Sequence, residues 1–357
     1  MPDFVTSPGE TLSEMLDERK MTQAELAERM GRPKKTINEI IQAKTAITPE
    51  TSVQFERVFG VPAEFWINRE ARYREYLAKK EEAERLEKQK AWLKKFPVSQ
   101  MASFNWVQHF PKDPIQQIRE LLNFFGVASP GQWQNRWAKQ CAAFKKSQAY
   151  SCSQESISAW LRKGEIEASN IQCQPFDRAE LIEIIPQFKA LTNESNPQVF
   201  IPKIQKLCSE VGVAVVFVRN LKQAPVFGSV RWISPDKALL QLSVRYKSDD
   251  HLWFSFFHEL GHILKHGKKD AFIEIKNVNA KNSEKEAEAD LFASEALISS
   301  KEYAKYIHPI STFSKTKVRQ IAREIGVSPG IVVGRLQHDG KLPPSHMNDL
   351  KQRYIWT

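Results

Sequence analysis

The sequence predicts a mostly α-helical fold with a smaller α+β part, divided into several domains. Three observations lead to this fold class. The chain has 357 residues, more than one ordinary hydrophobic core supports, so two or three domains are expected. Apolar residues recur at helical spacing through the first 76 residues and again in later segments. The apolar run 213–218 is rich in valine and is typical of a buried β-strand.

Composition excludes several classes of protein. Hydrophobic residues make up 41% of the chain and charged residues 26%, which is ordinary for a globular protein. No apolar run approaches the roughly 18 residues needed to cross a bilayer, and the first residues lack the features of a secretory signal. The four cysteines include no CxxC pair and indicate neither a disulfide framework nor a zinc knuckle. We expect a cytoplasmic protein with no membrane contact, and its net charge of +10 is consistent with a polyanionic partner.

Residues 1–76 are expected to form a compact bundle of short helices. The segment 22–25 has the form of a capping box that begins a second helix, which ends at Gly31. Pro33 begins a third helix, and Thr48 caps a fourth that runs to Phe59. Two short helices joined by a glycine-containing turn are the layout of a helix-turn-helix. A small helical bundle with an ordinary solvated face fits the same pattern.

Several segments of this bundle resemble the HigA-type antitoxins of the Xre helix-turn-helix family. They are residues 8–10, 21–27, 37–40, 46–51 and 64–66. The resemblance implies a homodimeric repressor that binds a double-stranded DNA operator and is often paired with a toxin. It also implies phosphate contacts for two residues and base contacts for four. The implied phosphate contacts are Gln23 and Lys44, and the implied base contacts are Lys34, Lys35, Thr36 and Asn38. The entry to the third helix, 32–35, departs from the small polar residues usual in this family.

The middle of the chain is predicted to be helical. Residues 77–96 are expected to form a charged, exposed helical linker, because Glu, Lys and Arg dominate there and no heptad repeat is sustained. Residues 97–170 contain four tryptophans and several phenylalanines, which predict a helical subdomain with its own aromatic core. A sensor pocket and a structural spacer fit that subdomain equally well.

Residues 171–357 are expected to form a domain that contains a small β-sheet. Helices are predicted at 182–191 and 199–211, a buried strand at 213–218, and a hairpin from strands 226–233 and 238–242. An edge strand of such a sheet could hold an extended peptide by main-chain pairing. The segment 318–336 also resembles a helix-turn-helix, but we interpret it mainly as the closing helices of this domain.

The pentapeptide His258-Glu259-Leu260-Gly261-His262 is the strongest functional signal. On a helix, positions i and i+4 share a face, so both imidazoles can reach one Zn²⁺ ion. Glu259 lies beside the first ligand, where it can accept a proton from a water at the metal. The flanking residues are apolar, and burying the polar side chains among them would cost several kcal/mol without a metal.

A third ligand is predicted in the strongly helix-forming segment 286–293. Glu286 lies 24 residues after His262, and Glu286 and Asp290 share one helical face. One of these carboxylates can bind zinc while the other accepts the second N–H of a ligand histidine. Glu284 and Glu288 compete for the ligand role, and we prefer Glu286 because of its pairing with Asp290. The alternative is a helix pair that carries these residues without binding a metal.

The segments 257–262 and 286–293 resemble the ImmA/IrrE zinc metallopeptidases. These are gluzincin-like bacterial enzymes, several of which cleave transcriptional repressors, and the resemblance extends over residues 175–345. It implies His258, His262 and Glu286 as Zn²⁺ ligands, Glu259 as the general base, and Asp290 as the partner of a ligand histidine. The oxyanion-stabilising residue stays open among four candidates, Tyr246, His266, His308 and His346.

The sequence therefore predicts a cytoplasmic, antitoxin-like transcription regulator fused to a zinc-dependent endopeptidase. The predicted substrate is a repressor, a toxin partner or the chain itself, whose exposed segment 70–95 would be the natural target of self-cleavage. The alternative is a non-enzymatic antitoxin or repressor whose metal-stabilised domain binds a toxin or ligand. A third possibility is a sensor whose substrate groove stays blocked until a signal arrives.

Overall fold

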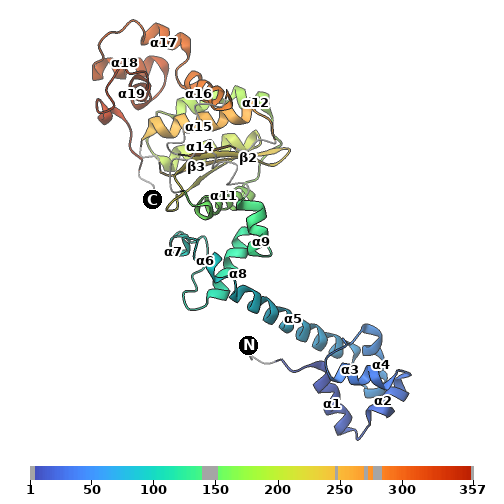
Figure 1. Ribbon diagram of the computed structural model, residues 1–357. Helices are drawn as coiled ribbons and strands as arrows, with labels where there is room; N and C mark the ends of the chain where they lie inside the picture. The colour runs from blue at the N-terminus through green and yellow to red at the C-terminus, as the bar shows by residue number, and fades with distance from the viewer. Residues whose placement is uncertain (1–4, 139–151, 246–247, 269–271, 276–283, 355–357) are drawn as a thin grey trace. The chain divides into compact units, whose positions relative to one another are not determined.

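The computed structural model describes residues 5–138, 152–245, 248–268, 272–275 and 284–354. The chain divides into two compact units, Met1–Ala91 and Trp92–Thr357, which we describe one at a time (Figure 1). Within the described ranges, no helix combines the length and the apolar character that a bilayer crossing requires.

The first unit consists of five helices, which are α1 Pro8–Glu18, α2 Gln23–Met30, α3 Lys34–Ile41, α4 Pro49–Phe59 and α5 Ala63–Glu87. The predicted caps are confirmed, because the side chains of Thr22 and Thr48 accept hydrogen bonds from backbone N–H groups in the first turns of α2 and α4. Gly31 ends α2 in the left-handed conformation, with φ of 61°. The core of this unit is apolar, and its fully buried members include Leu12, Leu26, Ile37, Phe55 and Trp66.

Helix α5 continues into the segment that was predicted to be a helical linker. It runs for 25 residues to Glu87 and is followed by the short helix α6 Lys90–Leu93, so together they include most of the predicted linker at 77–96. The predicted domain boundary at residue 76 falls inside α5. In the second unit, Trp92 packs on Phe96 and Trp133, with ring centroids 4.7 and 5.9 Å away.

The second unit begins with helices whose aromatic side chains pack together, in line with the aromatic core expected there. These elements are α7 Val98–Ser103, α8 Pro114–Phe125, α9 Pro130–Trp133, the π-helix η1 Gln134–Ala138, and α11 Gln154–Ser169. Phe125 contacts Phe96, Trp133 and Trp137 at centroid distances of 5.5–6.0 Å. Helix α11 packs on the sheet that follows, and the indole N–H of Trp160 donates to the carbonyl of Val218 over 3.2 Å.

A four-stranded mixed sheet forms the centre of the second unit. Its strands are β1 Val213–Val218, β2 Val226–Ser234, β3 Lys237–Ser243 and β4 Phe272–Ile275, in the order β1-β3-β2-β4. β1 runs parallel to β3, and β2 is antiparallel to both β3 and β4. The predicted strand 213–218 and the predicted hairpin are confirmed. The sequence did not indicate β4, because four residues are too few to show a period.

Helices cover both faces of this sheet. Figure 1 shows α11 on one face, with α14 Pro197–Glu210 and α15 Asp249–Lys265 on the other. The remaining helices are α12 Arg178–Glu183, α13 Ile185–Leu191, α16 Glu284–Leu297, α17 Ser300–Tyr306, α18 Lys315–Ile325, α19 Pro329–His338 and the 3₁₀ turn η2 Asn348–Leu350. Helix α19 packs on α15 and buries Ile331, Val332 and Leu336, so it closes the core of this unit.

Candidate metal centre and nucleic-acid interface

Helix α15 lies between the sheet and α16, which explains why its polar motif is buried. It contacts β2 and β3 as well as α16. His258, Glu259 and His262 are only 4%, 0% and 2% exposed. Three polar side chains therefore lie in an apolar core, where each needs a hydrogen bond or a metal to offset its lost hydration.

Gly261 allows α15 and α16 to approach closely. A Cβ atom at this position would lie 3.1 Å from the Cα of Ala289 and 3.2 Å from the ring of Phe292. Both values are tighter than ordinary van der Waals contacts, so a larger residue would push the helices apart. The small residue pair Gly261 and Ala289 thus brings Glu286, one turn before Ala289, within reach of the two histidines.

The side chains of His258, His262 and Glu286 converge on one point. The two Nε2 atoms of the histidines are 3.0 Å apart, and Oε2 of Glu286 lies 3.2 Å from Nε2 of His258 and 3.5 Å from Nε2 of His262. Ligand atoms of the three residues all lie within 4.8 Å of one another. Two imidazoles and one carboxylate are the donor set of catalytic zinc sites, which leave a further position open, so these residues fit a Zn²⁺ ion.

The electrostatics of the centre favour a charged Glu286 and disfavour the charged form of His262. Burial raises the pKa of Glu286, but hydrogen bonds and charges from His258 and His262 outweigh it and lower that pKa to about 2. Burial lowers the pKa of His262, against the opposing effect of Glu286. Ionised carboxylate and neutral imidazole are the protonation states that bind a metal.

Each of the two motif histidines has a partner on its other ring nitrogen. Nδ1 of His258 lies 2.9 Å from Oδ1 of Asp290, and Nδ1 of His262 lies 3.0 Å from Nδ1 of His266. Nε2 of His266 in turn lies 3.1 Å from Oε2 of Glu288. If both histidines bind a metal through Nε2, their Nδ1 atoms carry the protons. His258 then donates to Asp290, and His262 donates to Nδ1 of His266, whose Nε2–H donates to Glu288. Asp290 thus lies where the sequence placed it, and Glu288, considered as a ligand, contacts His266 instead.

The structure describes three of the four candidates for the oxyanion-stabilising residue. His266 contacts the ring edge of His262 that faces away from the converging Nε2 atoms. His308 and His346 are exposed, and Tyr246 lies outside the described residues. The position of His266 favours holding the ring of His262, a role that the sequence did not indicate.

Two further contacts could not have been read from the motif. A Cβ at Gly228 of β2 would lie 2.2 Å from Oε1 of Glu259, so only glycine leaves room for that carboxylate beside the strand. The ring of Phe272 in β4 stacks on His262 with centroids 3.9 Å apart. The sheet therefore leaves room for the predicted base at β2 and contacts one predicted ligand from β4. A glycine inside a strand was the available signal for the first contact.

In the first unit, α3 carries four of the six residues expected to contact DNA. Ile37 and Ile40 face the core, and Lys34 and Lys35 on the same helix are exposed. The other four predicted contacts are placed as follows: Thr36, Asn38 and Gln23 are partly exposed, and Lys44 is exposed after the end of α3.

The turn before α3 is held by side chains. Nε of Arg32 donates to Oε1 of Gln54 over 2.5 Å, and Nε2 of Gln54 donates to the carbonyl of Met30 over 3.3 Å. Arg32, part of the atypical entry to α3, therefore helps tie the turn between α2 and α3 to α4. The exposed face of α3 is compatible with insertion into a major groove.

Family comparisons assign a domain to each unit. Residues 208–337 match the M78 peptidase family model, described as an IrrE N-terminal-like domain. Residues 12–66 match a helix-turn-helix family model. The chain therefore contains a helix-turn-helix DNA-binding domain and an M78 peptidase-family domain, as the sequence resemblances had indicated.

Two solved structures are similar to a part of the chain. One is an addiction module antidote protein of the HigA family from Coxiella burnetii, with 29% identity, 24% of this chain and 92% of that chain covered, and a TM-score of 0.22. The other is Pseudomonas aeruginosa antitoxin HigA with the higBA promoter, with 27% identity, 24% and 92% covered, and a TM-score of 0.23. The comparison with curated proteins gave no match.

Proposed function

We propose that this chain is a cytoplasmic DNA-binding regulator of the antitoxin type that is also a zinc-dependent endopeptidase. The observation that carries the proposal is the convergence of His258, His262 and Glu286, with Glu259 buried beside them. The M78 family match supports the same assignment. A metal with a purely structural role would not need the carboxylate of Glu259 beside its ligands on the motif helix.

The roles of the residues follow from their places. A Zn²⁺ ion held by His258, His262 and Glu286 would supply Lewis acidity, which polarises a carbonyl and acidifies a nearby water. Glu259 would accept the proton of the attacking water and return it to the departing amine. Asp290 and His266 would hold the ligand rings in the tautomer that leaves Nε2 as the donor atom.

For the substrate we propose a separate DNA-binding protein or toxin partner. Peptidase grooves that use an edge strand hold their substrate extended. The segment 70–95, the expected target of self-cleavage, is mostly helical, since α5 runs to Glu87 and α6 follows it. Self-cleavage there would first require the helix to unfold, whereas a disordered segment of another protein needs no such step.

For the DNA-binding domain we propose a homodimer that binds a palindromic operator. The domain matches a helix-turn-helix family, and its third helix presents two exposed lysines together with Thr36 and Asn38. A two-fold dimer would place two such helices about one turn of DNA apart.

The decisive experiment compares the full-length protein with its Glu259→Gln variant. We expect both proteins to hold one zinc ion. The variant should bind a candidate repressor or toxin without cleaving it, and the wild type should cleave that same protein. Glu183→Gln, an exposed change on α12, is the matched control and should cleave normally. If the wild type holds zinc but cleaves no captured partner, and the Glu259→Gln variant regulates normally, the non-enzymatic antitoxin is the correct function.

A further inference from the structure

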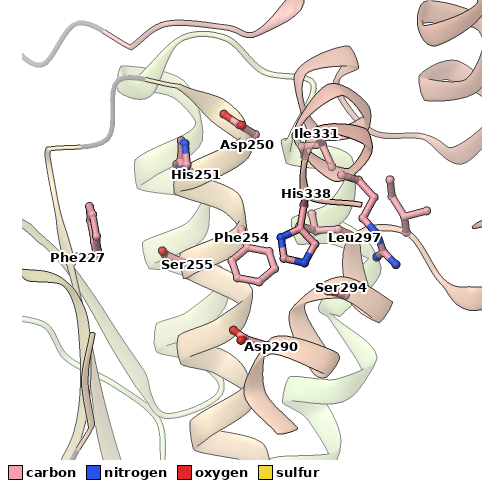
Figure 2. A pocket seen from close by; sticks show the side chains of 13 residues that line it. Phe227, Asp250, His251, Phe254, Ser255, Asp290, Ser294, Leu297, Ile331 and His338 are labelled. Carbon is pink, nitrogen blue, oxygen red and sulfur yellow. The ribbon is translucent and has the colours of Figure 1, made fainter. Parts of the chain in front are cut away.

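Two hollows in the second unit differ in the charge of their walls. One is an apolar cavity of about 350 Å³ between α15, α16, α19 and β2, and Figure 2 shows Asp250 and Asp290 among its lining residues. Asp290 also contacts His258, so this cavity lies beside the converging ligands. The other, which we call the basic hollow, has a volume of about 660 Å³ and lies where the end of α7 meets the loop 219–225 between β1 and β2. Within the described part of the chain, no acidic side chain lines the basic hollow.

Three basic side chains line this hollow. They belong to Arg219, Lys222 and Arg245, and all three residues are exposed. Arg219 directly follows β1, and Arg245 lies two residues after the end of β3. Because β1 and β3 are adjacent and parallel, with Val218 paired to Ser243, both strands end at the same edge of the sheet. The fold therefore gathers cations that are distant in the sequence at the carboxyl ends of two strands, where open α/β sheets bind their ligands.

Within the described ranges, no carboxylate balances these three cations. Arg219, Lys222 and Arg245 form no ion pair with any residue that the structure describes. The guanidinium of Arg219 instead lies over the ring of Phe104, 5.5 Å from its centroid. Like charges gathered in one hollow repel one another, and an anion bound between them removes that repulsion. The charge of the basic hollow therefore favours an anionic ligand.

The loop that carries two of the cations is held in place by side-chain amides. Nδ2 of Asn220 donates to the carbonyls of Ala224 and Val226 over 3.1 and 2.9 Å. Oε1 of Gln100, on α7, accepts the backbone N–H of Lys222 over 2.8 Å, and Nε2 of Gln100 donates to the carbonyl of Asn220 over 3.5 Å. The loop is thus fixed both internally and against α7. A site that is ordered before its ligand arrives loses little entropy on binding.

The basic hollow also has an apolar side. Phe104, the residue after α7, is half-buried there, and Leu221, Ala224 and Pro225 line the hollow as well. A planar base gains free energy by stacking on an aromatic ring, while phosphate oxygens gain from charge-assisted hydrogen bonds with Arg and Lys. A volume of about 660 Å³ is within the range of small-ligand pockets and exceeds what a lone phosphate fills. The ligand should therefore combine several negative charges with a planar ring.

We propose that the basic hollow binds a nucleotide with two or more phosphates. The phosphates lie at Arg219, Lys222 and Arg245, and the base lies against Phe104. The aromatic subdomain at 97–170 then acts as a sensor pocket, one of the two roles that its sequence left open, because α7 and Phe104 form one wall. Arg245 lies four residues before the start of α15, so the nucleotide contacts the segment that leads into the motif helix. Nucleotide binding here requires neither a metal nor peptide cleavage.

The test is calorimetric titration of the full-length protein with ADP, AMP and adenosine. ADP should bind about tenfold more tightly than AMP or better, and adenosine should bind most weakly, because each phosphate adds charge-assisted hydrogen bonds. Arg219→Gln combined with Arg245→Gln should weaken ADP binding by about 10- to 100-fold. The matched control combines Arg319→Gln with Arg323→Gln, which removes two exposed arginines from α18, outside the hollow. It should bind ADP like the wild type.

A second variant tests the place of the base. Phe104→Leu should weaken ADP binding by roughly 5- to 100-fold, because a stacking surface is lost, and should bind inorganic pyrophosphate like the wild type. Normal pyrophosphate binding also shows that this variant has folded. If Phe104→Leu binds ADP as tightly as the wild type, the base does not lie on this ring and the assignment of a nucleotide is wrong.

The other outcomes are equally distinct. Equal binding of ADP and AMP, or equal losses in the two double-arginine variants, would overturn the nucleotide site. If ADP fails to bind while a short single-stranded thymidine oligonucleotide binds and is lost in Arg219→Gln with Arg245→Gln, the hollow is a nucleic-acid groove instead. If no nucleotide binds at all, the aromatic subdomain is a structural spacer. Absence of zinc or of cleavage in a protein that binds ADP as expected would refute the proposed peptidase and leave this site standing.

Discussion

The two candidate sites of this protein are built in opposite ways. The expected DNA-binding face is the exposed side of a single helix, α3, whose other side anchors it through Ile37 and Ile40. The candidate metal centre is buried and is assembled from α15 and α16, with β2 and β4 against it. A change on α3 should therefore alter binding and leave stability alone. A change at the metal centre should alter both, because metal binding and folding are coupled there.

Removing a metal ligand should have the largest effect. His258→Ala combined with His262→Ala leaves one ligand, so zinc affinity should fall by far more than the roughly 10- to 100-fold typical of partners that only contact a ligand. The melting temperature of the second unit should fall as well, because the zinc contribution to folding is lost. Metal analysis and calorimetry measure the two effects. Full zinc occupancy in the double variant would refute the assignment of the ligands.

The first residue of α15, Asp249, is buried, and it predicts that the stability of the second unit depends on pH. The DNA-binding unit should lack this dependence. Burial raises the pKa of Asp249 to about 6, although Ser328 donates a hydrogen bond to its carboxylate over 2.6 Å. An acid with a raised pKa binds its proton more tightly when folded, so it contributes stability below pH 4 or so that is lost as the pH rises through about 6. The shift corresponds to about 3 kcal/mol between the fully protonated and the fully ionised carboxyl.

The measurement compares wild type with Asp249→Asn by thermal unfolding at several pH values. The difference between them should change by about 2 kcal/mol from pH 4 to pH 8, with the wild type losing stability relative to the variant as the pH rises. Asp236→Asn, an exposed change in the hairpin, is the control and should show no such trend. Parallel curves for wild type and Asp249→Asn would contradict the prediction.

Partners of the ligand histidines should have intermediate effects. Asp290→Ala and His266→Ala should each retain zinc but lower its affinity roughly 10- to 100-fold, because a ligand ring loses the group that fixes its tautomer. Competition with a chelator measures the affinity, and the exposed His308→Ala is the control. Wild-type affinity in His266→Ala would mean that its contact with His262 has no effect on the metal. Wild-type affinity in Asp290→Ala would weaken the choice of Glu286 over the neighbouring glutamates.

The smallest effects on stability are expected on α3 and in the turn that follows it. Asn38→Ala should relax base preference and weaken operator binding by about 1–3 kcal/mol, whereas Lys44→Ala should weaken binding to all DNA sequences and reduce the salt slope by about 1. Both variants should melt at the wild-type temperature, because neither side chain is buried in the core. Binding titrations at several salt concentrations distinguish them. Identical effects of the two substitutions would argue against recognition by α3.

Where sequence reasoning succeeded, the signals were local. Thr22 and Thr48 were identified as caps from residues within one helical turn, and the strand 213–218 from six consecutive apolar residues. The two motif histidines are four residues apart on one helix, so the helical repeat alone places them close together. Glu286 could be proposed from its i, i+4 pairing with Asp290. The residues between the two helices did not indicate how the chain returns from one helix to the other.

The limits appear where contacts join distant segments. The predicted helical linker at 77–96 is largely helix, but its composition did not show that α5 runs without a break from Ala63 to Glu87. His266 could not be distinguished from three other candidates by sequence alone, since its role depends on the orientation of His262. The cavity beside the ligands joins four elements that are spread over more than 100 residues of the chain.

The sequence by itself determined the types of the main elements, the helix-turn-helix layout, and the chemistry of the residues that would bind a metal. Caps, periods and i, i+4 pairs act within one or two turns, so they are encoded in neighbouring residues. Tertiary structure alone decided that Gly261 lets α16 approach α15, that Gly228 makes room for Glu259, and that α19 closes an apolar cavity. These features depend on distances between chain segments, and close packing sets such distances only when the whole unit has folded.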